Sequence, residues 1–292
     1  MFSSKSKIAV IGAGRVSYSL VNALVKSGFN VSTIVSRSVT SAKTLAVRLK
    51  IKNFSSDLYL LTADPKIFFL SVPDNQISKL AKEISKLNLD FENSIFIHLS
   101  GAENISVLNA LKRKGAYTAS FHIMQTFPDK KIFNLKNSYV AIETKNKKAE
   151  SFLFTLAKRL NLHPFKISSQ NKIYYHLAGV YSSNFLVANQ YYVKKLFDRT
   201  NSGVDYKKVF HPISEMTLKN VKEKDIQNAI SGPVARGDII TVKKHLKILR
   251  NDNTLRSNYI SQSLTLLELL KKRDKKLSDS QKELKNYLLK ML

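Results

Sequence analysis

The first 28 residues contain the feature that most constrains the fold: a short apolar run, a glycine-rich turn and a helical pattern, in that order. The run KIAVI (7–11) is rich in β-branched residues, and the apolar spacing of SYSLVNALVKSG (17–28) predicts a helix. Between them lies a Gly-x-Gly-x-x-Ser motif formed by Gly12, Gly14 and Ser17. This strand, turn and helix setting is the one in which dinucleotide-binding proteins place their glycine fingerprint.

Each small residue of the motif has its own role in such a site. Gly12 permits the tight turn, and Gly14 lets the backbone approach a pyrophosphate at the helix N-terminus, where unpaired N–H groups and the helix dipole favour anions. Ser17 replaces the usual third Gly or Ala, is small enough for helix packing, and could donate to a phosphate. The alternative is a glycine turn with no ligand. We expect the cofactor contacts of this segment to come from Gly12, Ala13, Gly14, Arg15 and Val16.

The end of the second expected strand distinguishes between the two nicotinamide dinucleotides. An acidic residue there accepts from the ribose 2′-hydroxyl of NADH, whereas a basic residue accommodates the 2′-phosphate of NADPH. The segment NVSTIVSR (30–37) ends in Ser36, Arg37 and Ser38, with no carboxylate. Arg37 could bind a phosphate bidentately, with the flanking hydroxyls as further donors. The sequence therefore favours NADPH over NADH, the alternative being an ordinary surface arginine.

Strands and helices alternate through the first half of the chain, which indicates βαβ units and a parallel sheet. Further strands are expected over 66–72, 94–100, 116–122, 138–144 and 163–168. The helices between strands are expected to run from Thr40 or Ser41 to residue 50 and over 75–88, 105–115 and 147–160. Beyond residue 169 the strand signals stop, and 170–197 has the pattern of one long, largely apolar helix. Further helices are expected near 205–224, 238–250, 254–272 and 278–291.

The predicted fold class is therefore α/β, in two domains. Residues 1–168 would form a Rossmann-type domain with a doubly wound, mostly parallel sheet, and residues 169–292 an all-helical domain for dimerisation and substrate binding.

Composition excludes several classes of protein. The chain has no cysteine, so it has no disulfide framework, Cys-based zinc site or thiol nucleophile, and we predict no metal site. It has no run of about 18 apolar residues, so we expect a cytoplasmic protein with no membrane partner. The formal net charge of +27 would attract nucleic acid, but its lysines are scattered without interleaved aromatic residues. We therefore expect no specific nucleic-acid partner, although a nucleic-acid-binding protein remains an alternative.

Several longer motifs occur beside the glycine turn. They are LSVPDNQI (70–77), HLSGA (98–102), SFHIMQTF (120–127), YHLAGVYSSNFLVA (175–188) and SGPVARGD (231–238) with its following TVKKHL. With these motifs the chain resembles the Rossmann-like oxidoreductases that carry the C-terminal domain of unknown function 2520. That family is related to pyrroline-5-carboxylate reductase and to the 6-phosphogluconate and β-hydroxyacid dehydrogenases.

The resemblance implies a helical C-terminal domain like that of 6-phosphogluconate dehydrogenase, with homodimerisation through its long helix. It implies no particular substrate. The β-hydroxyacid dehydrogenases place a Lys and an Asn about one helical turn apart on that helix. Here Lys172 and His176 have that spacing and Asn184 follows two turns later, so their mechanism cannot simply be transferred.

Loops after the carboxyl ends of the strands supply most of the remaining site candidates, because ligands of open α/β sheets bind there. Val72 and Pro73 lie at the end of one expected strand, and Ser100 and Gly101 lie at the end of the next. The glycine allows a ring to approach closely, and the serine could bind a carboxamide or a substrate oxygen. His122 follows a further strand and could be a general acid or an anion donor. The alternatives are a helix-capping role for the loop after Val72 and a satisfied loop histidine at 122.

The long helix supplies the other candidates. His176 and Ser183 share one stripe of it, with Asn184 at its flank. Reduction of C=O or C=N develops charge on the heteroatom, and His176 is the first choice for the acid that protonates it. Its alternative is a packed histidine in a dimer interface. Arg236 could bind a substrate carboxylate or, equally, pair with Asp238.

These observations predict an NADPH-dependent oxidoreductase that acts on a small anionic carbonyl or imine at the interdomain cleft. The proposed catalytic residues are His176, Ser100 and His122, and the proposed substrate contacts are Ser183, Asn184 and Arg236. The alternative is a non-catalytic NAD(P)-binding or sensing protein that has kept the fold.

Overall fold

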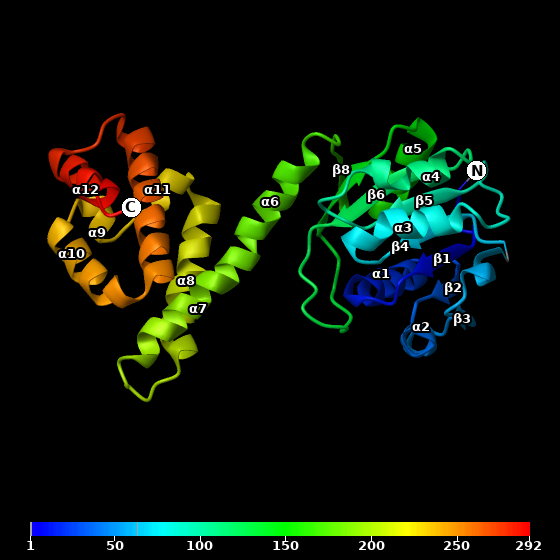
Figure 1. The fold of residues 1–292 in the computed structure, drawn as a ribbon, viewed down its shortest axis with the longest axis horizontal. Helices are drawn as coiled ribbons and strands as arrows, with labels where there is room; N and C mark the ends of the chain where they lie inside the picture. Colours follow the sequence, from blue (N-terminus) through cyan, green and yellow to red (C-terminus); the bar gives the residue numbers. More distant parts are fainter. Residues whose placement is uncertain (1, 63) are drawn as a thin grey trace. The chain divides into compact units, whose positions relative to one another are not determined.

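The computed structural model describes residues 2–62 and 64–292, and the chain divides into two compact units, Met1–Phe185 and Leu186–Leu292 (Figure 1). The first unit contains one eight-stranded sheet. Its strands are β1 (Ile8–Ile11), β2 (Val31–Val35), β3 (Asn53–Ser55), β4 (Ile67–Leu70), β5 (Ile95–His98), β6 (Tyr117–Ile123), β7 (Tyr139–Glu143) and β8 (His163–Lys166).

The strand order is β3-β2-β1-β4-β5-β6-β7-β8. The first six strands are mutually parallel, β7 runs antiparallel to β6, and β8 is parallel to β7. The order of those first six strands is that of the dinucleotide-binding Rossmann sheet, whose direction of winding reverses between β1 and β4. The predicted mostly parallel, Rossmann-type fold class is confirmed.

Helices cover both faces of the sheet, because the central strands are apolar on both sides. The helices of this unit are α1 (Arg15–Lys26), α2 (Val39–Arg48), α3 (Asp74–Ile84), α4 (Asn109–Lys112), α5 (Lys147–Arg159) and α6 (Lys172–Ser182), with 3-10 turns η1 (Leu58–Thr62) and η2 (Ile105–Leu108). Side chains of α1, α2 and α5 share one core with the sheet, and those of α3 and α4 share a second core on the opposite face. Phe68 and Phe96 stack within the second core, with ring centroids 4.4 Å apart.

Three local elements of the first unit differ from the sequence prediction. Helix α2 starts at Val39 rather than at Thr40 or Ser41, because the Ser38 side chain accepts from the Ser41 N–H. Strand β3 was not predicted: it has three residues at the sheet edge and no continuous apolar run. The helix expected over 105–115 is a 3-10 turn followed by a single α-helical turn.

The single long helix expected over 170–197 is two helices. Helix α6 ends at Ser182 and α7 (Asn184–Asp198) begins after Ser183, whose φ of −126° and ψ of −68° are not helical. Helix α6 is part of the first compact unit, which ends at Phe185. The boundary predicted at residue 168 separates a cofactor-binding domain from a substrate domain. It stays a prediction, because the two compact units are defined by their internal packing and not by what they bind.

The second unit is helical. Its elements after α7 are α8 (Tyr206–Glu223), η3 (Ile226–Ala229), α9 (Pro233–Arg236), α10 (Ile239–Ile248), η4 (Leu249–Asn251), α11 (Asn253–Asp274) and α12 (Asp279–Leu289). Its core comes from α9 to α12 and includes Val242, Ile260, Leu267 and Leu284. By contrast, neither α7 nor α8 buries any of its residues. Within the described residues, no helix is long and apolar enough to cross a membrane.

Candidate functional site

The glycine turn joins β1 to α1 at the carboxyl edge of the sheet. Gly12 has a φ of +109°, and a Cβ there would lie 2.0 Å from the Ser71 carbonyl oxygen, so only glycine fits. Gly14 is the N-cap of α1, and no side chain caps this helix. The first turn of α1 also contains no acidic residue, so its free N–H groups and positive dipole end favour an anion.

Ser17, at the third position of the motif, is fully buried under the turn. Its hydroxyl hydrogen-bonds the Gly12 carbonyl oxygen at 2.6 Å and the Ser71 hydroxyl at 2.8 Å. The serine therefore fastens the turn to the loop after β4. The sequence suggested that Ser17 contacts a phosphate. For that contact, the Ser17 hydroxyl would have to break its hydrogen bonds to Gly12 and Ser71.

A cavity of about 700 Å³ opens at the glycine turn, in the crevice between the carboxyl ends of β1, β2 and β4. Its lining includes most of the predicted cofactor contacts: Gly12, Ala13, Gly14, Ser36, Arg37, Ser38, Val72 and Pro73. Arg15, Val16, Ser100 and Gly101 are predicted contacts that do not line it. The lining also contains residues that the sequence analysis missed, among them Ser41, Ser56, Gln76, Lys79 and Lys130.

Arg37 lies at the end of this cavity formed by the loop after β2. Its guanidinium has no hydrogen bond or ion pair with any other residue in the described part of the chain, and its side chain is exposed. Ser36, Ser38 and Ser41 line the same end of the cavity, and no carboxylate follows β2. The turn and the uncapped N-terminus of α1 fit the pyrophosphate of a dinucleotide.

The second group of predicted residues gathers around Gly101, in the loop after β5. A Cβ on Gly101 would lie 2.7 Å from Nε2 of His122 and 2.9 Å from Cδ2 of His176. The centroids of these two imidazole rings are 6.4 Å apart. Two histidines predicted from separate segments therefore flank one glycine, although their roles remain predictions. The neighbouring Ser100 is buried and its hydroxyl accepts from the Ala102 and Glu103 N–H groups, so it shapes this loop.

His122 is held by α6. Its Nδ1 lies 2.8 Å from the Tyr175 hydroxyl. Burial lowers the pKa of His122 to about 4, with smaller contributions from the charges of Lys172 and His176. His122 is therefore neutral at neutral pH, and the imidazolium expected of a general acid does not form there.

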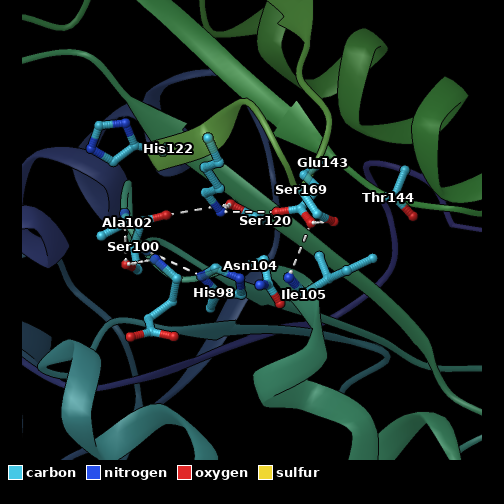
Figure 2. Close-up of polar contacts among 12 residues, drawn as sticks. His98, Ser100, Ala102, Asn104, Ile105, Ser120, His122, Glu143, Thr144 and Ser169 are labelled. Carbon is cyan, nitrogen blue, oxygen red and sulfur yellow. Dashed lines mark hydrogen bonds and ion pairs between the residues drawn. The ribbon is translucent and has the colours of Figure 1, made fainter. Parts of the chain in front are cut away.

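A buried polar network lies next to His122 (Figure 2). His98, Ser120 and Glu143 are in register across β5, β6 and β7, so their side chains share the face of the sheet that α3 and α4 cover. Lys172, the first residue of α6, donates to the Ser120 hydroxyl at 2.5 Å and to Oε2 of Glu143 at 3.1 Å. Its side chain is 1% exposed.

The other carboxylate oxygen of Glu143, Oε1, also accepts hydrogen bonds. Oε1 accepts from the Ser169 hydroxyl at 2.5 Å and from the Ile105 N–H at 3.2 Å. Burial lowers the pKa of Lys172, and the adjacent Glu143 opposes that shift. Because the carboxylate is this close and fully hydrogen-bonded, we regard the pair as charged.

His98 extends this network toward Gly101. Its Nδ1 accepts from the Ser100 N–H at 3.2 Å, which leaves the ring proton on Nε2. Nε2 is buried and has no partner among the described residues. Burial also lowers the pKa of His98 well below its usual value, and the charge of Lys172 lowers it further. His98 is therefore neutral as well.

The remaining candidates belong to other segments of the chain. Ser183 is the residue between α6 and α7, and Asn184 is exposed at the start of α7. Arg236 is exposed at the end of α9 in the second unit. Asp238 caps α10 through the N–H and hydroxyl of Thr241 and forms no direct ion pair with Arg236 in the described part of the chain. The charge of Arg236 nevertheless contributes to lowering the pKa of Asp238, after the bonds to Thr241, so both alternatives for Arg236 stay predictions.

Sequence reasoning missed Lys172 and Glu143 as members of the site. A lysine at the first position of a helix is unfavourable for the helix dipole, and this was the signal available. The missing side chain of Gly179 leaves space beside α6. Met124 of the loop after β6 occupies that space, because a Cβ on Gly179 would lie 3.1 Å from its Sδ.

Two family models match the chain in succession. The model of a "Rossmann-like domain" matches residues 2–123, and the model of a "Domain of unknown function (DUF2520)" matches residues 138–265. This chain joins a Rossmann-like domain to a DUF2520 domain. The Rossmann-like segment supplies His98, Ser120 and His122, and the DUF2520 segment supplies Glu143 and Lys172. The buried network therefore connects the two family segments.

Solved structures share this architecture over nearly the whole chain. A "putative NADP oxidoreductase" from Bacteroides fragilis is 24% identical, with a TM-score of 0.78 over 90% of this chain and 98% of that one. A Thermotoga maritima protein is 24% identical, with a TM-score of 0.69 over 91% and 99%. A pyrroline-5-carboxylate reductase from Coxiella burnetii is 14% identical, with a TM-score of 0.56 over 94% and 100%. At these identities the likeness establishes the fold. No curated protein matches the sequence.

Proposed function

We propose that this protein is an NADPH-dependent oxidoreductase that reduces, or in the reverse direction oxidises, a small anionic carbonyl or imine compound. One observation carries the proposal: a single cavity joins the glycine turn at the N-terminus of α1 to the free Arg37 at the end of β2. The turn suits a pyrophosphate and the arginine suits a 2′-phosphate. The name of the Bacteroides fragilis neighbour agrees with this choice of cofactor.

The charges of the cavity support NADPH over NADH. Arg37, Lys79 and Lys130 contribute three cations to its lining, and Glu83, on α3 one turn after Lys79, contributes a carboxylate. A carboxylate at the end of β2 would repel the 2′-phosphate, and none is present there. The net charge of +27 would further attract an anionic substrate.

The two histidines beside Gly101 suit the chemistry of such a reduction. Bound NADPH would supply the hydride that is added to the carbon of C=O or C=N. The heteroatom gains negative charge as that bond forms, and His176 would give it a proton and regain one from solvent. His122 would hydrogen-bond the same heteroatom, and Gly101 would leave room for the reacting groups. Ser100, Ser183, Asn184 and Arg236 remain proposed contacts of cofactor or substrate.

We also propose that the protein is a homodimer. Helices α7 and α8 bury none of their residues, and Val187, Tyr191, Ile213 and Met216 are among their exposed apolar side chains. Apolar surface of this extent is characteristic of an interface. A second copy of the chain carries the same exposed apolar helices and is present in every solution of the protein, so we propose it as the partner.

Calorimetric titration of NADPH and NADH into the wild type and Arg37→Ala tests the proposed function. We expect the wild type to bind NADPH more tightly, and the substitution to weaken NADPH binding about 10-fold to 100-fold while NADH binding is unchanged. Lys43→Ala is the matched control, because Lys43 is exposed on the adjacent helix α2 but does not line the cavity. Failure of the wild type to bind either nucleotide would refute the proposal.

A further inference from the structure

Lys172 occupies a position that is unfavourable for a lysine on two counts. It is the first residue of α6, where the helix dipole repels a cation, and its side chain is almost fully buried. A lysine at this position therefore requires specific compensation, which Glu143 and Ser120 supply. Sites at which a local rule is broken and compensated in this way are frequently functional.

The face of α6 that contains Lys172 also holds the groups around His122. Residues 172, 175, 176 and 179 recur at helical spacing on one side of α6. Tyr175 contacts His122, His176 flanks Gly101, and Gly179 packs against Met124. The buried charge of Lys172 and the hydroxyl of Tyr175 therefore act on the same imidazole.

The hydrogen bond between Tyr175 and His122 determines which ring nitrogen carries the proton. Burial raises the pKa of Tyr175, so its hydroxyl keeps its proton. Among the described residues, Nδ1 of His122 is the one acceptor within reach of that hydroxyl. If Nδ1 carried a proton, the partly buried phenol would lose its acceptor. The proton of neutral His122 consequently lies on Nε2, which faces Gly101.

We propose that Lys172 is a positioning residue whose buried charge, together with the burial of the ring itself, disfavours a second proton on His122. Tyr175 orients His122 so that its Nε2–H points toward Gly101 as a hydrogen-bond donor. This inference rests on the proposed function and assigns His122 a different role from the general acid that the sequence suggested. A neutral imidazole polarises a carbonyl by hydrogen bonding and keeps its proton. Proton transfer is then left to His176.

The charged and titratable groups around His122 come from several elements. Lys172, Tyr175 and His176 lie on α6, His98 lies on β5, and Glu143 lies on β7. The charges of Lys172 and His176 both disfavour the imidazolium of His122. Glu143, with Asp74 and Glu103 at longer range, stabilises the ammonium form of Lys172. Removal of the Lys172 charge should therefore make His122 easier to protonate.

NMR titration of the six histidines in the cofactor-free protein tests the role of Lys172, with His122 assigned from the spectrum of His122→Asn. We expect wild-type His122 to remain neutral from pH 8 down to about pH 5.5. In Lys172→Met its pKa should rise by about one unit or more. Lys166→Met is the control, because Lys166 is an exposed lysine paired with Glu150 on the same unit.

A second variant keeps the test decisive if Lys172→Met does not fold. The double variant Lys172→Met/Glu143→Gln removes the ammonium without leaving a carboxylate unpaired, and the amide oxygen introduced at position 143 can still accept from Ser169 and Ile105. It should produce the same rise in the His122 pKa. An unchanged pKa in either folded variant, or a wild-type His122 that titrates near 6.5, would overturn the proposal.

Imidazole 15N chemical shifts test the role of Tyr175 separately. We expect the wild type to show the Nε2–H tautomer of His122, and Tyr175→Phe to show a mixture of both tautomers. A wild-type Nδ1–H tautomer, or an unchanged tautomer in Tyr175→Phe, would contradict the assignment. Because these spectra are recorded without cofactor, their outcome is independent of the nucleotide titration that tests the proposed function.

Discussion

Gly12 and Gly14 are two residues apart in one turn, yet folding requires a glycine at only the first of them. Gly12 has a positive φ and no space for a Cβ, whereas Gly14 has a φ of −80° and its nearest potential contact is at 3.7 Å. We expect Gly12→Ala to lower the free energy of unfolding by about 2–5 kcal/mol in urea denaturation.

Gly14→Ala is the matched control for that measurement. Its stability should stay within about 1 kcal/mol of the wild type, since the added methyl group meets the Ser71 carbonyl oxygen at 3.7 Å, an ordinary van der Waals distance. Its affinity for NADPH should nevertheless fall, because the methyl group projects where a pyrophosphate would approach. Equal destabilisation by both substitutions would contradict this account of the turn.

His122 should make the protein sensitive to acid. Its pKa is lowered from 6.5 to about 4 in the folded chain, mainly by burial. Its contribution to stability is complete above pH 6.5 and is lost as the pH falls toward 4, because the unfolded chain binds the proton first. We expect His122 alone to account for about 3 kcal/mol of lost stability between pH 7 and pH 4, measured by urea denaturation. The same measurement on His122→Asn should show a flatter pH dependence, and identical slopes would refute the prediction.

Single residues that follow strand ends could be identified from the sequence, because strand ends can be read from apolar runs. Gly101 and Arg37 are of this kind, and His122 lies one residue before the end of β6. The pairing of Lys172 with Glu143 could not be identified, because the two residues are 29 positions apart and meet only after β7 has paired antiparallel with β6.

At the level of elements, long apolar patterns predicted the structure well and short ones did not. The central strands and the helices α1, α3 and α5 were identified because their apolar spacing extends over whole elements. Strand β3 was missed because three residues at a sheet edge have no periodicity. The division between α6 and α7 at Ser183 was missed because the residues on both sides of it continue one apolar pattern.

Helix α8 provides the test of the proposed dimer. Ile213 is 63% exposed on this helix, which buries none of its residues. We expect Ile213→Glu to convert a dimer into a monomer, measured by light scattering after gel filtration, because a buried carboxylate at an interface has a high desolvation cost. Ile240→Glu is the control, since Ile240 is 66% exposed on α10, which packs into the helical core with its other side. A wild-type monomer would exclude the proposed assembly.

At the scale of the whole molecule, the net charge of +27 predicts attraction to any polyanion. The lysines that produce this charge are distributed over both compact units. We expect retention on immobilised DNA at low salt that is lost by about 0.2 M salt, without preference for any sequence. Retention at that salt, or a clear sequence preference, would favour a nucleic-acid-binding function.

We propose that a phosphorylated dinucleotide lies along the carboxyl edge of the sheet, from Arg37 past the glycine turn to Gly101. A crystal structure of the protein with NADP⁺ would reveal this binding mode. We predict that the 2′-phosphate lies within hydrogen-bonding distance of the Arg37 guanidinium and that the nicotinamide ring lies beside Gly101, near His122 and His176. A nicotinamide ring remote from Gly101, or a 2′-phosphate without contact to Arg37, would contradict the account.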